Sequence, residues 1–193
     1  MSDNLHERLS LVRNHYVDAL LNAVSEADES EVVFEPVLRN SEGEPVGDGA
    51  LNLPCRVDAF QTTDGQSRMI DSPGVPKLPD LTTLVSGVQV TLKPFIWDFA
   101  RVTVHHGSEP FPTDELKDWF DDWFDADEQE ELLENGLSGC IHFMSDPDTS
   151  DGQTSFTIDF GSAPEKAFTT MIECFQGVQD CVVEVTSLAA EPN

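Results

Sequence analysis

Five polar residues in the second half of the chain have side chains that could work together chemically. They are Arg101, His105, His142, Asp159 and Glu184. Arginine can clamp an anion, histidine can transfer a proton, and carboxylates can act as acids or bases. If their strands pair as expected below, all five lie on one sheet face and form a hypothetical pocket for a small ligand or substrate. The alternative is that other parts of the chain pack over this face and the polar groups satisfy one another.

A second group of polar residues, all acidic, lies in the stretch TDELKDWFDDWFDADEQEELLE at positions 113–134. The candidate interaction residues are Asp114, Glu115, Asp118, Asp121, Asp122 and Asp125. The apolar residues between them repeat at i, i+3, i+4, i+7 and i+8, which places them on one helix face. These are Leu116, Trp119, Phe120, Trp123 and Phe124. Either this face docks a partner helix or peptide while the acids select a basic one, or it is buried in the core and the acids form a solvated back.

The charge balance limits the possible partners. The chain has 37 acidic and 10 basic residues, which gives a formal net charge of -27. Such a charge argues against binding nucleic acid phosphates or an anionic membrane surface, because both would be repelled. Three explanations for the acidity stay open: adaptation to high salt, recognition of a basic protein partner, and a general solubility bias.

No metal or cofactor motif is complete. Cys140 and His142 share a strand face and could hold a metal together with a carboxylate, but two ligands alone define no site. The segment DPDTSDG departs from a calcium loop in the place of its glycine and is better interpreted as a hairpin turn. The four cysteines form no C-x-x-C pair and are expected as reduced thiols. We therefore predict neither a metal site nor a cofactor.

The second half of the chain has an order of elements typical of a ferredoxin-like βαββαβ unit. The expected elements are strand 95–105, helix 113–134, strand 139–144, strand 154–160, helix 163–176 and strand 181–187. Thr113 is expected to cap the first of these helices, with a second short helix after Asp127, and Ser162 with Glu165 matches a capping box for the last. We expect an α+β fold whose residues 93–188 form the ferredoxin-like unit.

Residues 1–92 are expected to add an N-terminal helix and antiparallel strands that extend or cover this sheet. An apolar stripe from Leu5 to Val24 predicts the helix. Strands are expected at 32–38 and 51–61, paired with each other, and at 88–92. The proline-containing segment 62–80 is either a lid or docking arm, or an ordered surface crossing.

These features favour a single α+β domain of 193 residues. No signal-peptide pattern or apolar run of roughly 20 residues is found, so a cytoplasmic location is expected. The favoured function is a non-enzymatic interaction protein that binds a basic partner. The alternative is a small-molecule-binding or enzymatic domain that uses the polar sheet face. The sequence does not indicate an oligomeric state.

Overall fold

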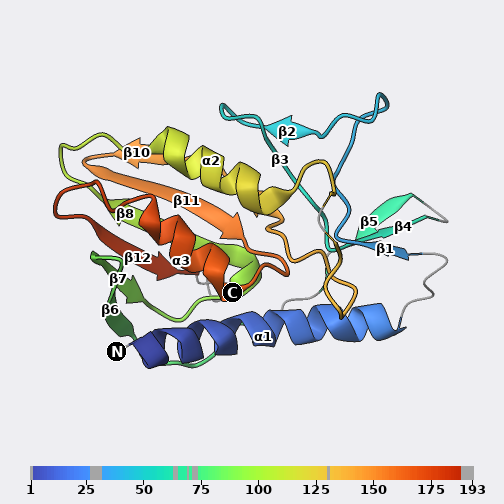
Figure 1. The fold of residues 1–193 in the computed structure, drawn as a ribbon, viewed down its shortest axis with the longest axis horizontal. Coiled ribbons are helices and arrows are strands. Elements are labelled where there is room, and N and C mark those ends of the chain that lie inside the picture. The colour runs from blue at the N-terminus through green and yellow to red at the C-terminus, as the bar shows by residue number, and fades with distance from the viewer. Residues whose placement is uncertain are drawn as a thin grey trace, which may run out of the picture.

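A seven-stranded sheet forms the centre of the protein (Figure 1). The computed structural model describes residues 2–26, 32–62, 65–68, 70, 74–129 and 131–187. The strands of this sheet are β6 (Leu81–Val85), β7 (Val88–Leu92), β8 (Ala100–His105), β9 (Phe143–Met144), β10 (Asp148–Ser150), β11 (Gln153–Asp159) and β12 (Val182–Thr186). Their order is β10-β11-β8-β12-β7-β6, and β9 also pairs with β11. All neighbours are antiparallel except β12 and β7, which are parallel.

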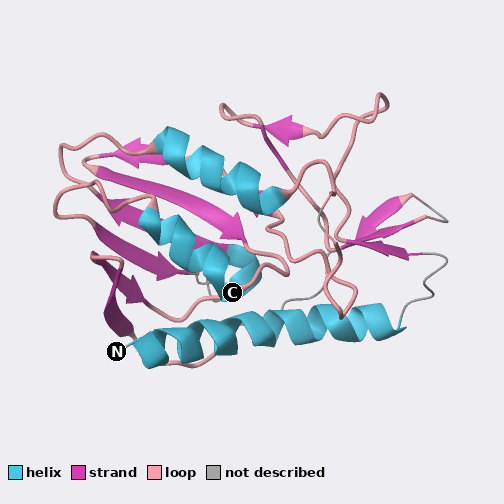
Figure 2. Cartoon of the chain, viewed as in Figure 1, coloured by secondary structure: helices cyan, strands magenta, loops and turns pink. Residues whose placement is uncertain are grey.

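Two helices, α2 (Thr113–Phe124) and α3 (Glu165–Glu173), lie side by side over one face of this sheet (Figures 1 and 2). Their apolar faces are buried, as the helical spacing predicts. The sheet presents alternate apolar residues to them, because successive strand side chains point to opposite faces. The buried strand residues are Ala100, Val102, Val104, Phe156, Ile158, Val183 and Val185.

The N-terminal helix α1 (Ser2–Glu26) packs against α3 and against the 3-10 helix η1 (Trp97–Phe99). Arg13 fixes the contact with α3, since its Nε donates to Ala163 O at 2.7 Å and its Nη2 to Ser162 O at 2.8 Å. Ser10 Oγ donates to the Glu165 carboxylate at 2.8 Å. These bonds join α1 to the start of α3.

Two smaller sheets come from the first half of the chain. A three-stranded sheet has the order β1-β4-β5, and β2 pairs with β3. The strands are β1 (Val32–Phe34), β2 (Gly47–Asp48), β3 (Leu53–Pro54), β4 (Ala59–Gln61) and β5 (Gln66–Arg68). The described part of segment 62–80 contains β5, and Pro79 O accepts a hydrogen bond from Arg8 at 2.7 Å.

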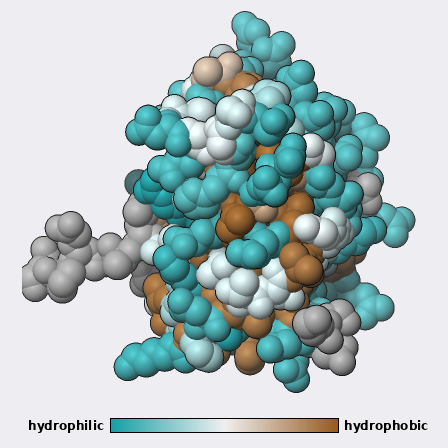
Figure 3. All heavy atoms as spheres, turned by 90° about the vertical axis from the view of Figure 1, so that its left-hand side faces the viewer, coloured by the Kyte–Doolittle hydropathy of each residue, from teal (hydrophilic) through white to brown (hydrophobic). Residues whose placement is uncertain are grey.

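The chain has the mixed α+β composition that the sequence predicts, with three α-helices and several sheets in the described residues. Strands β6 and β7 extend the main sheet, and β6 had no counterpart among the predicted strands. The end of the molecule at the left of Figure 1 is mostly hydrophilic, with hydrophobic residues between (Figure 3). In the described part of the chain, no helix has the length and apolar character needed to span a bilayer.

Several local predictions are wrong. The strand expected at 95–105 begins only at Ala100, because Trp97–Phe99 form η1. The helix expected at 113–134 ends at Phe124, since Asp125 takes the left-handed conformation with φ 48°. No second helix follows Asp127, because the described residues on either side of position 130 form turns and loops.

The predicted caps and one strand also differ. Pro112 and Pro164 precede α2 and α3, and neither helix has a side-chain cap, so Thr113 and the Ser162–Glu165 pair do not cap. The strand expected at 139–144 is reduced to Phe143–Met144, and Phe143 is exposed.

Candidate functional site

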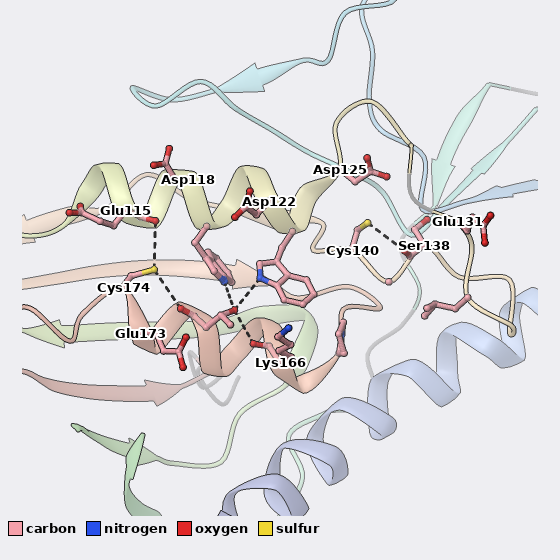
Figure 4. Close-up of a pocket in the computed structure, with 16 residues that line it drawn as sticks. Glu115, Asp118, Asp122, Asp125, Glu131, Ser138, Cys140, Lys166, Glu173 and Cys174 are labelled. Atoms are coloured by element: carbon pink, nitrogen blue, oxygen red, sulfur yellow. Dashed lines mark hydrogen bonds between the residues drawn. The ribbon is translucent and has the colours of Figure 1, made fainter. Parts of the chain in front are cut away.

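A groove with a volume of about 820 Å³ lies between α2 and α3 (Figure 4). One side is formed by polar residues of α2 and the other by residues of α3, because both helices turn their most apolar stripes toward the sheet. Ser138, Gly139 and Cys140 from the loop before β9 also line it. Its volume exceeds those of three other hollows on the described part of the chain, which are about 430, 400 and 330 Å³.

Two tryptophans of α2 form the apolar floor of this groove. Trp119 is buried, and Trp123 is half-buried. Both indole Nε1 atoms donate to Thr170 Oγ1 at 3.1 Å, and Trp119 Nε1 also approaches Ala167 O at 3.1 Å. The Thr170 hydroxyl donates in turn to Lys166 O at 2.9 Å. These bonds fix the orientation of both rings, and the half-buried Trp123 ring keeps exposed surface for contact with a ligand.

The rim of the groove is strongly acidic. Its carboxylates are Glu115, Asp118, Asp122, Asp125, Glu131 and Glu173, against a single cation, Lys166. Within the described part of the chain, no ion pair involves Glu115, Asp118 or Asp122. A surface with this charge and an aromatic floor is suited to a cationic ligand.

The structure places four of the six predicted interaction residues on this rim. Asp114 and Asp121 belong to α2 but do not line the groove. The Asp121 carboxylate instead pairs with Lys117 one turn away.

The five residues of the predicted polar pocket are divided between two places. Arg101, His105 and Glu184 lie on the sheet face opposite α2 and α3, where Glu184 pairs with Lys93 at 2.8 Å. His142 and Asp159 are buried, with His142 Nδ1 and Asp159 Oδ2 3.5 Å apart. Neither Arg101 nor His105 forms an ion pair with a described residue.

His142 and Asp159 belong to a buried cluster that includes two residues from the first half of the chain. Glu35 follows β1 and Asp58 precedes β4. The three-stranded sheet β1-β4-β5, called the small sheet below, therefore positions both carboxylates. His142 Nε2 lies 2.8 Å from Glu35 Oε1, and His142 Nδ1 lies 3.2 Å from Asp58 Oδ1. Glu35 and Asp58 were not among the candidate residues predicted from the sequence. Their apolar neighbours in the sequence indicate burial. Nothing in the sequence around Glu35 indicates that its partner is His142, 107 residues away.

Burial and mutual attraction oppose each other in this cluster. Burial alone would raise the carboxyl pKa values, yet contact with His142 holds the pKa of Glu35 and of Asp58 below its ordinary value. For Asp159 burial prevails and its pKa is raised. Burial would lower the pKa of His142, but the surrounding carboxylates, Asp159 first, raise it well above its ordinary value.

Cys174 provides a chemical probe of the groove. Burial, together with the charges of Glu115 and Glu173, raises the pKa of its thiol from 9.0 to about 11. The thiolate is the reactive form, so at pH 8 we expect Cys174 to react with iodoacetamide about a hundredfold more slowly than a thiol of unshifted pKa. Mass spectrometry of tryptic peptides over time measures this rate. If Cys174 reacts as fast as free cysteine, its pKa is not raised. The double variant E115Q/E173Q should react faster than the native chain, because it removes two of the charges that raise this pKa.

The two places differ in the chemistry that they can support. The groove offers fixed aromatic surfaces and carboxylates to a cation from solution. The buried cluster concentrates a histidine and three carboxylates away from solvent, where they can hold a proton or a metal ion. Comparison of the chain with protein-family models, curated proteins and solved structures found no match.

Proposed function

We propose that this chain is a non-enzymatic interaction protein that binds a basic segment of a protein partner in the groove between α2 and α3. The observation that carries the proposal is the combination of six rim carboxylates with a fixed tryptophan floor in one groove. Asp114 and Asp121 are predicted as interaction residues but do not line the groove, so they would contribute only to the negative electrostatic potential around it.

The end of α2 supports this proposal because its charges are unfavourable for the helix itself. Asp122 lies in the last turn, Asp125 follows it, and the last turn has no basic residue. Carboxylates at the negative end of a helix dipole are destabilising by some tenths of a kcal/mol to about 1 kcal/mol each. Arg56 already binds the Phe124 and Asp125 carbonyls at this end, and a bound cation beside Asp122 would reduce the remaining repulsion, so the arrangement favours a basic ligand.

The floor supports a ligand with arginine or lysine side chains. A guanidinium can stack on the half-buried Trp123 ring, and the hydrocarbon part of either side chain can pack against it. The twelve residues of α2 give a groove about 18 Å long. An extended segment of about five or six residues would fill that length.

We also infer that the second half of the chain is a ferredoxin-like unit within a single domain. Support comes from the strand order β10-β11-β8-β12, in which each neighbouring pair is antiparallel, with α2 and α3 on the connections. In this unit the pairing places both helices on one face, and their meeting line becomes the groove.

The test compares two double variants that change the net charge equally. D118N/D122N removes two rim carboxylates, whereas D114N/D121N removes two from the same helix outside the groove. The probe is an eight-residue peptide of alternating arginine and lysine, and binding is followed by tryptophan fluorescence at roughly 0.1 M salt. We expect the rim variant to bind about tenfold more weakly than the native chain, and the control variant to change by about twofold or less.

Equal weakening by both variants would contradict the proposal, because net charge alone would then attract the peptide. The acidity would in that case be explained by adaptation to salt or by solubility. Raising the salt to about 0.5 M should weaken binding to the native chain, since charge pairs at the surface are screened at that concentration.

A further inference from the structure

The imidazole of His142 has one ring nitrogen without a hydrogen-bond partner, although the side chain is fully buried. Its other nitrogen, Nε2, lies 2.8 Å from Glu35 Oε1. Glu35 is held as a carboxylate by backbone N–H groups, of Ser138 at 2.6 Å on Oε2 and of Ser162 at 3.2 Å on Oε1. An ionised carboxylate only accepts hydrogen bonds, so Nε2 carries the proton. Nδ1 lies on the other side of the ring, where it can hold either a second proton or a metal ion.

Two carboxylate oxygens face this Nδ1 atom. Asp58 Oδ1 lies 3.2 Å away and Asp159 Oδ2 3.5 Å away, and neither has the direction of a hydrogen bond from Nδ1. An imidazole nitrogen and two carboxylates that converge in a buried place repel one another unless a positive charge, either a proton on Nδ1 or a metal ion, lies between them, and a proton on Nδ1 has no aligned acceptor there. In the described part of the chain, no lysine or arginine forms an ion pair with Asp58 or Asp159.

The spacing of the three donor atoms fits a coordination sphere. Metal bonds of about 2.0–2.2 Å to nitrogen and oxygen place neighbouring ligands about 3.0–3.5 Å apart at octahedral to tetrahedral angles. The two measured separations from Nδ1 lie in this range, and all three donors lie within 4.8 Å of one another.

From this geometry we propose that Asp58, His142 and Asp159 bind a divalent transition-metal ion where α1, the small sheet and the main sheet meet. One imidazole nitrogen and two carboxylate oxygens suit zinc, manganese or iron(II) better than calcium or magnesium, which prefer oxygen alone. The site is separate from the groove and does not depend on the proposed function.

A second set of contacts orients each ligand, as is usual around bound metals. Glu35 fixes the tautomer of His142. Tyr16 Oη donates to Asp58 Oδ1 at 2.8 Å, and Gly161 N donates to Asp159 Oδ1 at 2.8 Å, which leaves Oδ2 toward His142. Glu35 and Asp58 belong to the first half of the chain and His142 and Asp159 to the second, so the metal would join the two.

The test is a titration of the full chain, after dialysis against a chelator, with Zn²⁺ by calorimetry and with Co²⁺ by visible absorption. We expect one ion per chain, a rise in melting temperature, and ligand-field bands of a nitrogen- and oxygen-bound Co²⁺. D159N should weaken Zn²⁺ binding at least about a hundredfold. The groove variant D118N/D122N should bind as the native chain does, because its carboxylates lie in a different place.

Three results would overturn the proposal. One is the absence of one-to-one binding at about 0.1 mM Zn²⁺, and another is unchanged binding by D159N. The third is loss of binding in the groove variant. If D159N fails to fold, nitrogen NMR of labelled histidine in the native chain decides. If the site binds zinc, the metal should change the nitrogen chemical shift of Nδ1 in one buried imidazole. If the cluster is only an imidazolium with carboxylates, both ring nitrogens are protonated and zinc leaves their chemical shifts unchanged.

Discussion

Replacing Arg56 with methionine is expected to lower the free energy of unfolding by about 3–5 kcal/mol, measured by urea denaturation. Arg56 is 5% exposed and donates to three backbone carbonyls: Phe124 O at 3.1 Å, Glu35 O at 2.6 Å and Asp125 O at 2.7 Å. Its guanidinium carbon also lies 5.2 Å from the centre of the Phe124 ring. Methionine keeps most of the chain length but leaves these buried acceptors unpaired.

The same substitution at Arg39 is the control. Arg39 donates to Ala126 O at 2.6 Å and pairs with Glu128 at 3.2 Å, but it lies at the surface. Water can replace these bonds, so R39M should lower the free energy of unfolding by at most about 1 kcal/mol. Similar losses in R39M and R56M would show that burial of the Arg56 guanidinium is not what holds the end of α2 to the small sheet.

The sequence was sufficient for the elements whose side chains repeat with a clear period. Leu116, Phe120 and Phe124 are buried on α2 because their spacing gives one apolar face, and packing of that face outweighs any local preference. Alternation in β8 and β12 identified the sheet face under the helices for the same reason.

The ends of the helices could not be predicted because tertiary contacts use the residues that would otherwise cap them. Ser162 Oγ accepts a hydrogen bond from Gly139 N at 2.8 Å, and Glu165 accepts one from Ser10. The end of α2 similarly depends on Arg56, a residue 68 positions earlier that binds the Phe124 carbonyl. Capping rules describe local competition and cannot include such distant partners.

The buried cluster shows the same limit for the candidate sites. His142 and Asp159 were selected from the sequence as members of a pocket with Arg101, His105 and Glu184, because strict alternation along regular strands was assumed. The chain before β9 is irregular, and it turns His142 toward Glu35 and Asp58. Pairing between segments so far apart follows from the fold and leaves no periodic signal in either segment.

Gly161→Ala is expected to be the second most damaging of these substitutions, with a loss of about 3 kcal/mol or more in the free energy of unfolding. Gly161 has φ 50°, a left-handed conformation that favours glycine. A Cβ atom there would lie 2.3 Å from His142 Cδ2 and 2.6 Å from Cys140 O. His142 is fully buried, so its ring has no free space into which to retreat.

Comparison with Gly107→Ala separates two contributions to the loss of unfolding free energy: the cost of a left-handed backbone and the cost of the steric clash. Gly107 has φ 60°, but a Cβ atom at that position would meet no atom within 4 Å. Its substitution should therefore carry only the left-handed penalty of about 1–2 kcal/mol. The additional loss of unfolding free energy in G161A, compared with G107A, measures how firmly the chain after β11 holds the His142 ring. Equal losses in the two variants would mean that the ring can move, and the orientation of His142 Nδ1 toward Asp58 and Asp159 would then not be fixed by packing.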